Sequence, residues 1–174
     1  DPPAEAMRLA VMDFVRRVVV ADPPHGPVLE VGRFDVNGSV RPLFAGLTYV
    51  GLDLRPGPAV DEVGDVSDPT TCHRLAATYG VFGTVISTET LEHVRHPWTA
   101  LSNLRWLLAP DGRLILTTVF TFPLHEYPSD YWRFTPPGLH ALLEDAGFRD
   151  IRIETEGGSE GSPMGVFATA RRSA

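Results

Sequence analysis

Gly32, Asp53 and Asp65 are the residues whose types and positions could do chemistry, because each stands at the end of a short apolar run. In an open α/β sheet, ligands bind beyond the carboxyl ends of the strands. We therefore expect these residues to lie along one edge of a sheet. A glycine there permits a tight turn, and the two carboxylates are hydrogen-bond acceptors.

The two acids have the spacing and chemistry that a nucleoside requires. Asp53 lies 21 residues beyond Gly32 (53 − 32), close to the roughly 20 residues that separate such a glycine from a ribose-binding acid. Asp65 could accept an exocyclic adenine amine, while the adjacent Val66 offers a backbone amide to a ring nitrogen. Each acid alone is also explained as a cap or turn residue. Together with Gly32, they predict a nucleoside site.

The loop after Gly32 does not match a dinucleotide fingerprint. That fingerprint requires glycine at positions 34 and 37, where Phe34 and Asn37 stand. The mismatch argues against a nicotinamide-dependent oxidoreductase, which stays open as an alternative function. A ligand without a pyrophosphate, such as a sulfonium, does not need the close backbone approach. Gly32 alone is equally explained as a turn residue.

The order of these segments resembles the class I S-adenosylmethionine-dependent methyltransferases, of the small-molecule, methyltransferase type 11-like branch related to ubiquinone biosynthesis. Glu30 and Gly32 match the first motif of that family, Asp53 its ribose-binding acid and Asp65 its adenine-side acid. Residues 85–94, which end in Leu-Glu-His-Val, resemble its fourth-strand motif, and residues 110–114 resemble the turn before its fifth strand.

The resemblance implies S-adenosyl-L-methionine as cofactor and methyl transfer to a small-molecule acceptor, with O-methylation favoured. The cofactor contacts that we predict are Glu30, Gly32, Asn37, Asp53, Leu54, Asp65, Val66 and Thr88. Two features depart from the family: the glycine loop is reduced to two glycines, and Ser87 and Thr88 replace an acid or other polar residue of many relatives. A non-catalytic binding subunit with the methyltransferase fold therefore stays open as a second class of function.

Residues 120–134 follow the predicted fifth strand and are expected to overhang the cofactor end of the sheet. This segment mixes aromatic residues with His125, Asp130 and Arg133, a composition that suits a lid selecting acceptors. Tyr131 and Arg133 are the predicted substrate-binding residues. The alternative is a packed loop in which Arg133 pairs with a nearby acid.

A general base is required only if the acceptor arrives protonated, as a hydroxyl does. His125 is the predicted base, because the pKa of a neutral imidazole lies near ~6.5. His93, which follows Glu92, is the competing candidate, with a purely structural role as its alternative. The other four histidines are expected to face solvent. No pair of histidines has i, i+4 ligand spacing with a carboxylate, so no metal site is predicted.

Hydrophobic periodicity predicts the elements that position these residues. Helices are predicted at 5–20, 70–79, 98–108 and 136–146, and buried strands at 28–31, 48–54, 60–63, 82–87 and 114–119. Residues 151–155 and 166–170 predict a terminal hairpin. Strands that alternate with helices indicate a parallel sheet covered on both faces. We therefore predict a single α/β domain over residues 1–174, with a doubly wound, mostly parallel seven-stranded sheet and a C-terminal antiparallel hairpin.

The composition limits the classes of partner that the chain is expected to bind. The net charge of −7 and the pI near 5.3 argue against the basic surface that nucleic-acid binding needs. No apolar run approaches the ~20 residues of a membrane span. One cysteine cannot form an internal disulfide, so a cytoplasmic location is predicted. The start at Asp1-Pro2-Pro3, with no methionine or leader, suggests a trimmed chain. The composition predicts no oligomeric state.

Overall fold

The computed structural model describes residues 2–32, 38–126 and 128–174. The strands in this part of the chain are β1 (Val28–Val31), β2 (Tyr49–Asp53), β3 (Glu62–Val63), β4 (Phe82–Thr88), β5 (Leu108–Val119), β6 (Phe148–Glu156) and β7 (Gly165–Arg172). The helices are α1 (Pro2–Ala21), α2 (Pro69–Tyr79), α3 (Pro97–Leu107) and α4 (Pro136–Asp145), with short 3-10 turns η1 (Arg41–Phe44) and η2 (Leu91–His93).

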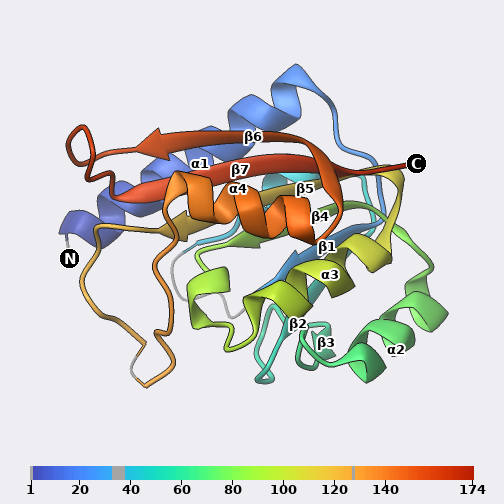
Figure 1. Ribbon diagram of the computed structural model, residues 1–174. Helices are drawn as coiled ribbons and strands as arrows, with labels where there is room; N and C mark the ends of the chain where they lie inside the picture. Colours follow the sequence, from blue (N-terminus) through green and yellow to red (C-terminus); the bar gives the residue numbers. More distant parts are fainter. Residues whose placement is uncertain (1, 33–37, 127) are drawn as a thin grey trace.

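The strands of the described residues form one seven-stranded sheet in the order β3-β2-β1-β4-β5-β7-β6 (Figure 1). The first five strands in this order pair in parallel, whereas β7 runs antiparallel to both β5 and β6. The order reverses between β1 and β4, which is where ligands bind in sheets of this kind. The predicted mostly parallel α/β sheet with a C-terminal antiparallel hairpin is confirmed.

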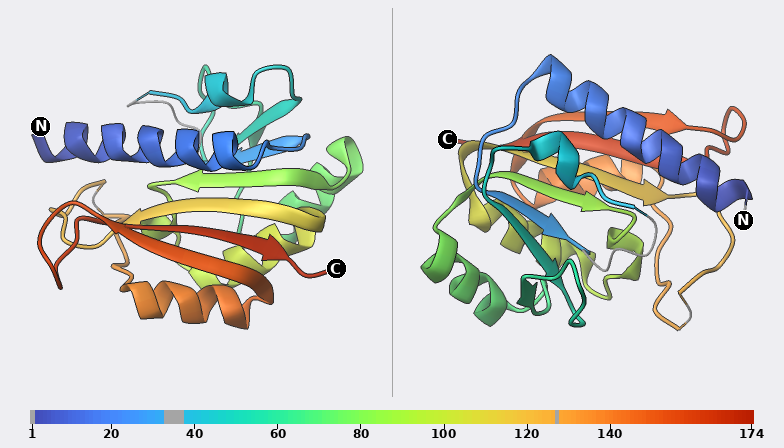
Figure 2. Two further views of the ribbon diagram at one scale, coloured as in Figure 1. Left: turned by 90° about the horizontal axis from the view of Figure 1, so that it is seen from above. Right: turned by 180° about the vertical axis from the view of Figure 1, so that it is seen from behind.

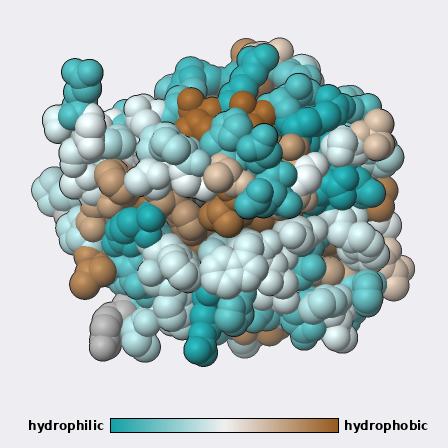
Figure 3. All heavy atoms as spheres, viewed as in Figure 1, coloured by the Kyte–Doolittle hydropathy of each residue, from teal (hydrophilic) through white to brown (hydrophobic). Residues whose placement is uncertain are grey.

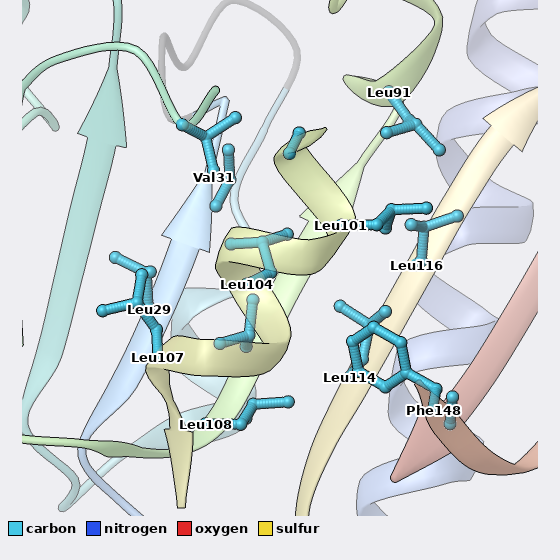
Figure 4. Close-up of a cluster of buried hydrophobic side chains, with 14 of the residues drawn as sticks. Leu29, Val31, Leu91, Leu101, Leu104, Leu107, Leu108, Leu114, Leu116 and Phe148 are labelled. Atoms are coloured by element: carbon cyan, nitrogen blue, oxygen red, sulfur yellow. The ribbon is translucent and has the colours of Figure 1, made fainter. Parts of the chain in front are cut away.

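Helices cover both faces of the sheet (Figure 2). α1 packs Phe14 and Val15 on one face, in a cluster that includes Ile86 and Phe167. The other face is covered by α2, α3 and α4, and Figure 4 shows leucines of α3 among residues of β1 and β5. Because strands β1, β2 and β4 are almost entirely buried, apolar residues predominate in them, and Glu30, Thr84 and Ser87 are buried beside those residues.

The fifth strand begins earlier than the sequence predicts. β5 starts at Leu108, six residues before the predicted 114 (114 − 108). Leu108 pairs with Phe82, and the register then shifts before Thr84 pairs with Arg113. The turn at residues 110–112 is therefore an irregularity within a strand, with Asp111 at φ +60°. Pairing across such a bulge depends on the neighbouring strand and is not visible in local sequence.

Polar and apolar residues are interspersed on the face that Figure 3 shows. Among the described residues, no helix is both long enough and apolar enough to span a bilayer.

The thiol of Cys72 should be unreactive in the folded protein. Burial, followed by the charges of Asp68 and Asp65, raises the pKa of this thiol to about 11, and its side chain lies in the apolar cluster beneath α2. Because the thiolate is the reactive form, we expect Ellman's reagent at pH 8 to modify the native protein about 100-fold more slowly than the unfolded protein. Equal rates with and without guanidinium would contradict this burial.

Candidate functional site

The backbone brings the predicted nucleoside-binding positions to one edge of the sheet. Val31 pairs with Leu52 and with Ser87, so the residues that follow, Gly32, Asp53 and Thr88, stand at the same level of three adjacent strands. Asp53 pairs with Val63 of β3, two residues before Asp65. The sequence prediction of a shared carboxyl edge therefore agrees with the observed strand register.

Both predicted nucleoside-binding acids also stabilise turns. Asp53 Oδ1 accepts a hydrogen bond of 3.0 Å from the amide of Arg55, and Asp65 Oδ1 accepts one of 2.7 Å from the amide of Ser67. Beside them, Leu54 is exposed and Val66 is buried. The turn role foreseen as an alternative is thus present, and a cofactor contact by these acids stays a prediction.

The first predicted motif is only partly described. Asn37 lies outside the described residues. Glu30 is buried, and its Oε2 accepts a hydrogen bond of 2.6 Å from the hydroxyl of Tyr49. The Thr88 carbonyl accepts a bond of 2.9 Å from the Thr90 hydroxyl. A direct cofactor contact by any of these residues stays a prediction.

Gly32 is required by a close contact. Its φ of +85° favours glycine, and a Cβ at this position would lie 2.0 Å from Thr90 Oγ1. The same hydroxyl donates to the carbonyl of Thr88, and a longer contact of 3.3 Å reaches the carbonyl of Val31. The end of β1 therefore packs directly against the segment that leaves β4.

Two acids on that segment each leave one oxygen unsatisfied. Among the described residues, Glu89 Oε1 and Glu92 Oε1 are buried and have no hydrogen-bond partner. Burial, together with the nearby charge of Glu92, raises the pKa of Glu89 well above its ordinary value. Burial also raises the pKa of Glu92, to about 7. Buried carboxylate oxygens without partners are costly, and this favours a ligand or cation at this point.

Glu92 joins the end of β4 to the lid, which we define as residues 120–134. Its Oε2 accepts a hydrogen bond of 2.8 Å from Thr118 of β5. Its backbone carbonyl accepts bonds from the amides of Tyr131 and Trp132, at 2.9 Å and 3.2 Å. The lid is therefore fastened beside η2, as Figure 1 also shows.

The two candidate bases are in direct contact. His93 Nε2 lies 3.0 Å from His125 Nε2, and Glu92 Oε1 lies 3.8 Å from the first nitrogen and 3.9 Å from the second. We call these three side chains the Glu92–His93–His125 cluster. Burial lowers the pKa of His93. The cluster is part-buried rather than sealed, because the His93 and His125 side chains are 19% and 28% exposed.

Arg133 has the structural role foreseen as an alternative to substrate binding. Its guanidinium donates to both oxygens of Asp130, at 2.6 Å and 2.9 Å. Asp130 in turn accepts a bond of 3.0 Å from the amide of His125. Arg133, more than any other neighbour, holds the pKa of Asp130 down at about 2. Tyr131 is exposed beside this pair, and substrate binding by Tyr131 and Arg133 stays a prediction.

A protein-family profile described as a methyltransferase domain matches residues 4–153. The chain belongs to this family. The match confirms the predicted class I methyltransferase, and with it S-adenosylmethionine as the cofactor. A search of curated proteins gives no match.

Solved structures of methyltransferases share the fold. The N-terminal domain of EvdMO1, crystallised in the presence of SAH and D-fucose, superposes with a TM-score of 0.66 at 22% identity, covering 93% of this chain and 82% of that chain. The 1,6-didemethyltoxoflavin-N1-methyltransferase of Burkholderia thailandensis gives 0.65 at 19%, covering 95% and 79%. The CurJ carbon methyltransferase gives 0.66 at 18%, covering 94% of this chain but only 54% of that chain.

Sequence reasoning missed Glu89 and Glu92 as members of the site. The signal was present, because two acids three residues apart directly follow an apolar strand. Such acids must either reach solvent or acquire a partner when the strand is buried. The lid, which binds the Glu92 carbonyl and brings Arg133 near both acids, is distant in sequence.

The contact between Gly32 and Thr90 can be tested with a matched pair of glycines. Gly46 has a similar φ of +86°, but a Cβ added there would meet nothing within 4 Å. Gly46→Ala should therefore cost only the backbone strain of about 1–2 kcal/mol. Gly32→Ala should cost a further 1–3 kcal/mol or so from overpacking. Chemical denaturation measures both free energies of unfolding.

A second substitution separates the contact from the strain. Thr90→Ala removes the two atoms nearest to the added methyl group, so it should be less destabilising in the Gly32→Ala background than in the wild type. Strictly additive losses would show that the two side chains do not meet.

Proposed function

We propose that this methyltransferase transfers a methyl group to a hydroxyl of a small-molecule acceptor that binds beneath the lid. The observation that carries the proposal is the Glu92–His93–His125 cluster, in which three hydrogen-bond acceptor atoms converge where β4 meets the lid. A hydroxyl acceptor must lose a proton when it is methylated, and this cluster can accept one.

The residues at the carboxyl edge suit the cofactor. Glu89 offers a buried, unsatisfied oxygen immediately after β4, which fits a cationic ligand or one that donates hydrogen bonds. We propose that Gly32, Asp53 and Asp65 hold the nucleoside along the neighbouring strand ends. When bound, S-adenosylmethionine supplies a methyl group on a sulfonium that leaves as a neutral thioether.

His125 is the group that we propose for removing the proton, with His93 beside it. Its Nδ1 lies 3.1 Å from the carbonyl of Pro123 and 3.3 Å from an oxygen of Asp130. Both neighbours are acceptors, so they fix the tautomer in which Nε2 carries the free lone pair. A base oriented in this way directs its lone pair toward His93 and Glu92.

A small acceptor is supported by the lid and by structural neighbours. The lid is pinned at Glu92 and Asp130, which leaves Tyr131 exposed as a contact for an incoming molecule. The N-terminal domain of EvdMO1 was crystallised in the presence of D-fucose, and the toxoflavin enzyme with bound 1,6-didemethyltoxoflavin. A cytoplasmic location, a single domain, and the absence of nucleic-acid or membrane partners stay predictions.

Replacing Asp53 tests the nucleoside site. We expect Asp53→Ala to weaken binding of S-adenosylhomocysteine by about 1–3 kcal/mol, roughly 5- to 150-fold, because a hydrogen-bond acceptor is lost. Calorimetry measures this loss. Asp145→Ala, at the exposed end of α4, should bind as the wild type does. No binding by folded wild-type protein would end the proposal.

Replacing His125 tests the proton acceptor. His125→Ala should lower kcat by about 100-fold or more, the scale of general-base catalysis, while affinity for S-adenosylhomocysteine stays at the wild-type value. Product formation with a panel of small hydroxyl compounds provides the assay, and His96→Ala, an exposed histidine before α3, is the matched control. An unchanged kcat in His125→Ala rules this role out, and turnover by the wild type excludes a non-catalytic subunit.

A further inference from the structure

The neutral side chains of His93 and His125 direct the lone pairs of their Nε2 atoms toward each other. His93 Nδ1 lies 2.9 Å from the carbonyl of Ser129, and His125 Nδ1 lies near the carbonyl of Pro123 and the carboxylate of Asp130. Carbonyl and carboxylate oxygens only accept hydrogen bonds, so the hydrogen of each neutral imidazole is on Nδ1. Both Nε2 atoms then present lone pairs to each other across 3.0 Å. Such an arrangement needs a positive charge between the two nitrogens.

Glu92 adds a third electron-pair donor to the same point. Its side chain is 0% exposed, and Oε1 has no hydrogen-bond partner among the described residues. Its other oxygen is held by Thr118, which fixes the orientation of the carboxylate. The three donor atoms come from η2 and from the lid, so the folded chain preorganises them.

The spacing and chemistry of the donors suit a metal ion. Two nitrogen ligands of one Zn²⁺, each at about 2.0–2.1 Å, stand roughly 3.0–3.4 Å apart, and the two Nε2 atoms are 3.0 Å apart. Each imidazole is oriented through Nδ1 by a second acceptor, the arrangement typical of metal-binding histidines. Imidazole and carboxylate together suit zinc-like transition ions better than Mg²⁺ or Ca²⁺.

The surroundings are rich in acidic groups. Glu89, Glu92 and Asp130 lie close to Arg133, whose guanidinium acts on both glutamates. A cation that enters here favours the charged form of these carboxyl groups, so the acidic groups and the ion stabilise each other. The part-exposed imidazoles leave a route to the cluster from solvent.

We propose that Glu92, His93 and His125 form a binding site for a divalent transition-metal ion of the Zn²⁺ class, with a position left open for the acceptor. The sequence predicted no metal site, because the ligands combine two adjacent residues with one that lies 32 positions away. The histidines then bind the ion through the same lone pairs that would otherwise take a proton, so in the metal-bound protein the ion, and not His125, activates the hydroxyl.

The role of the ion rests on the proposed function. A hydroxyl bound at the open position has its pKa lowered by the ion, as a metal-bound water does. Its O–H bond breaks and the proton passes to solvent; the oxygen pair forms the new O–C bond, and the S–C bond breaks with its electrons staying on sulfur. No oxidant or reductant is consumed.

Zinc titration of the whole chain tests the site without an activity assay. We expect one Zn²⁺ per chain by calorimetry, and in nuclear magnetic resonance spectra of the wild type only the His93 and His125 ring nitrogens should shift among the six histidines. His125→Ala should weaken Zn²⁺ binding by about 100-fold or more, since loss of outer-shell partners alone costs about 10–100-fold. Glu92→Gln, which keeps its size, should also weaken it.

His140→Ala is the matched control, because His140 is an exposed histidine 3.9 Å from Glu144, and it should bind Zn²⁺ as the wild type does. Absence of the His93 and His125 shifts overturns the metal site even if a variant fails to fold, and leaves a shared proton as the charge between them. Unchanged affinity in folded His125→Ala also overturns it. If the protein binds S-adenosylhomocysteine but not Zn²⁺, the metal site is wrong and the proposed function stands. If it binds Zn²⁺ but not S-adenosylhomocysteine, the proposed function is wrong and the metal site stands.

Discussion

The buried carboxylate of Glu92 is the interaction on which the site depends. Through Oε2 it holds Thr118 of β5, and its backbone carbonyl accepts two amides of the lid. Through Oε1 it faces both imidazoles. An ionisable group with 0% exposure is tolerated only where specific partners offset its desolvation. The same residue therefore fixes the lid and places a carboxyl group beside both imidazoles.

The parallel sheet supplies the rigidity that this arrangement needs. Gly32 at the end of β1 admits the Thr90 side chain, and Thr90 in turn binds carbonyls of β1 and β4. The residues between β4 and η2 are thereby held against the strand ends rather than left as a free loop. Because the residues proposed to bind the nucleoside stand at the same strand ends, the proposed cofactor site and the histidine cluster share one scaffold.

Local sequence patterns predicted most of the fold, because buried strands and amphipathic helices have distinct periodicities. The start of β5 was missed, since Leu108 pairs with Phe82 across a bulge that only the neighbouring strand defines. The site was predicted in part: the strand ends of Gly32 and Asp53 follow from topology, and both histidines were selected as candidates. Their mutual contact was not predictable, because it joins residues on either side of α3 and β5 that only tertiary packing brings together.

The raised pKa values of Glu89 and Glu92 affect how much negative charge lies near the proposed site, and therefore the energy of the transition state. The proposed transfer from a sulfonium to a deprotonated hydroxyl removes both charges, so fixed negative charge near the sulfonium stabilises the reactants more than the transition state. Burial and the charge of Glu92 raise the pKa of Glu89 well above its ordinary value, which favours the neutral carboxyl, and a neutral carboxyl carries no such charge while still forming hydrogen bonds. Glu92, with a pKa of about 7, can instead lose its proton when a cation binds to the imidazoles. In the proposed site the two acids thus have different roles: Glu89 favours the neutral form beside the cofactor, and Glu92 becomes charged when a cation binds beside the acceptor.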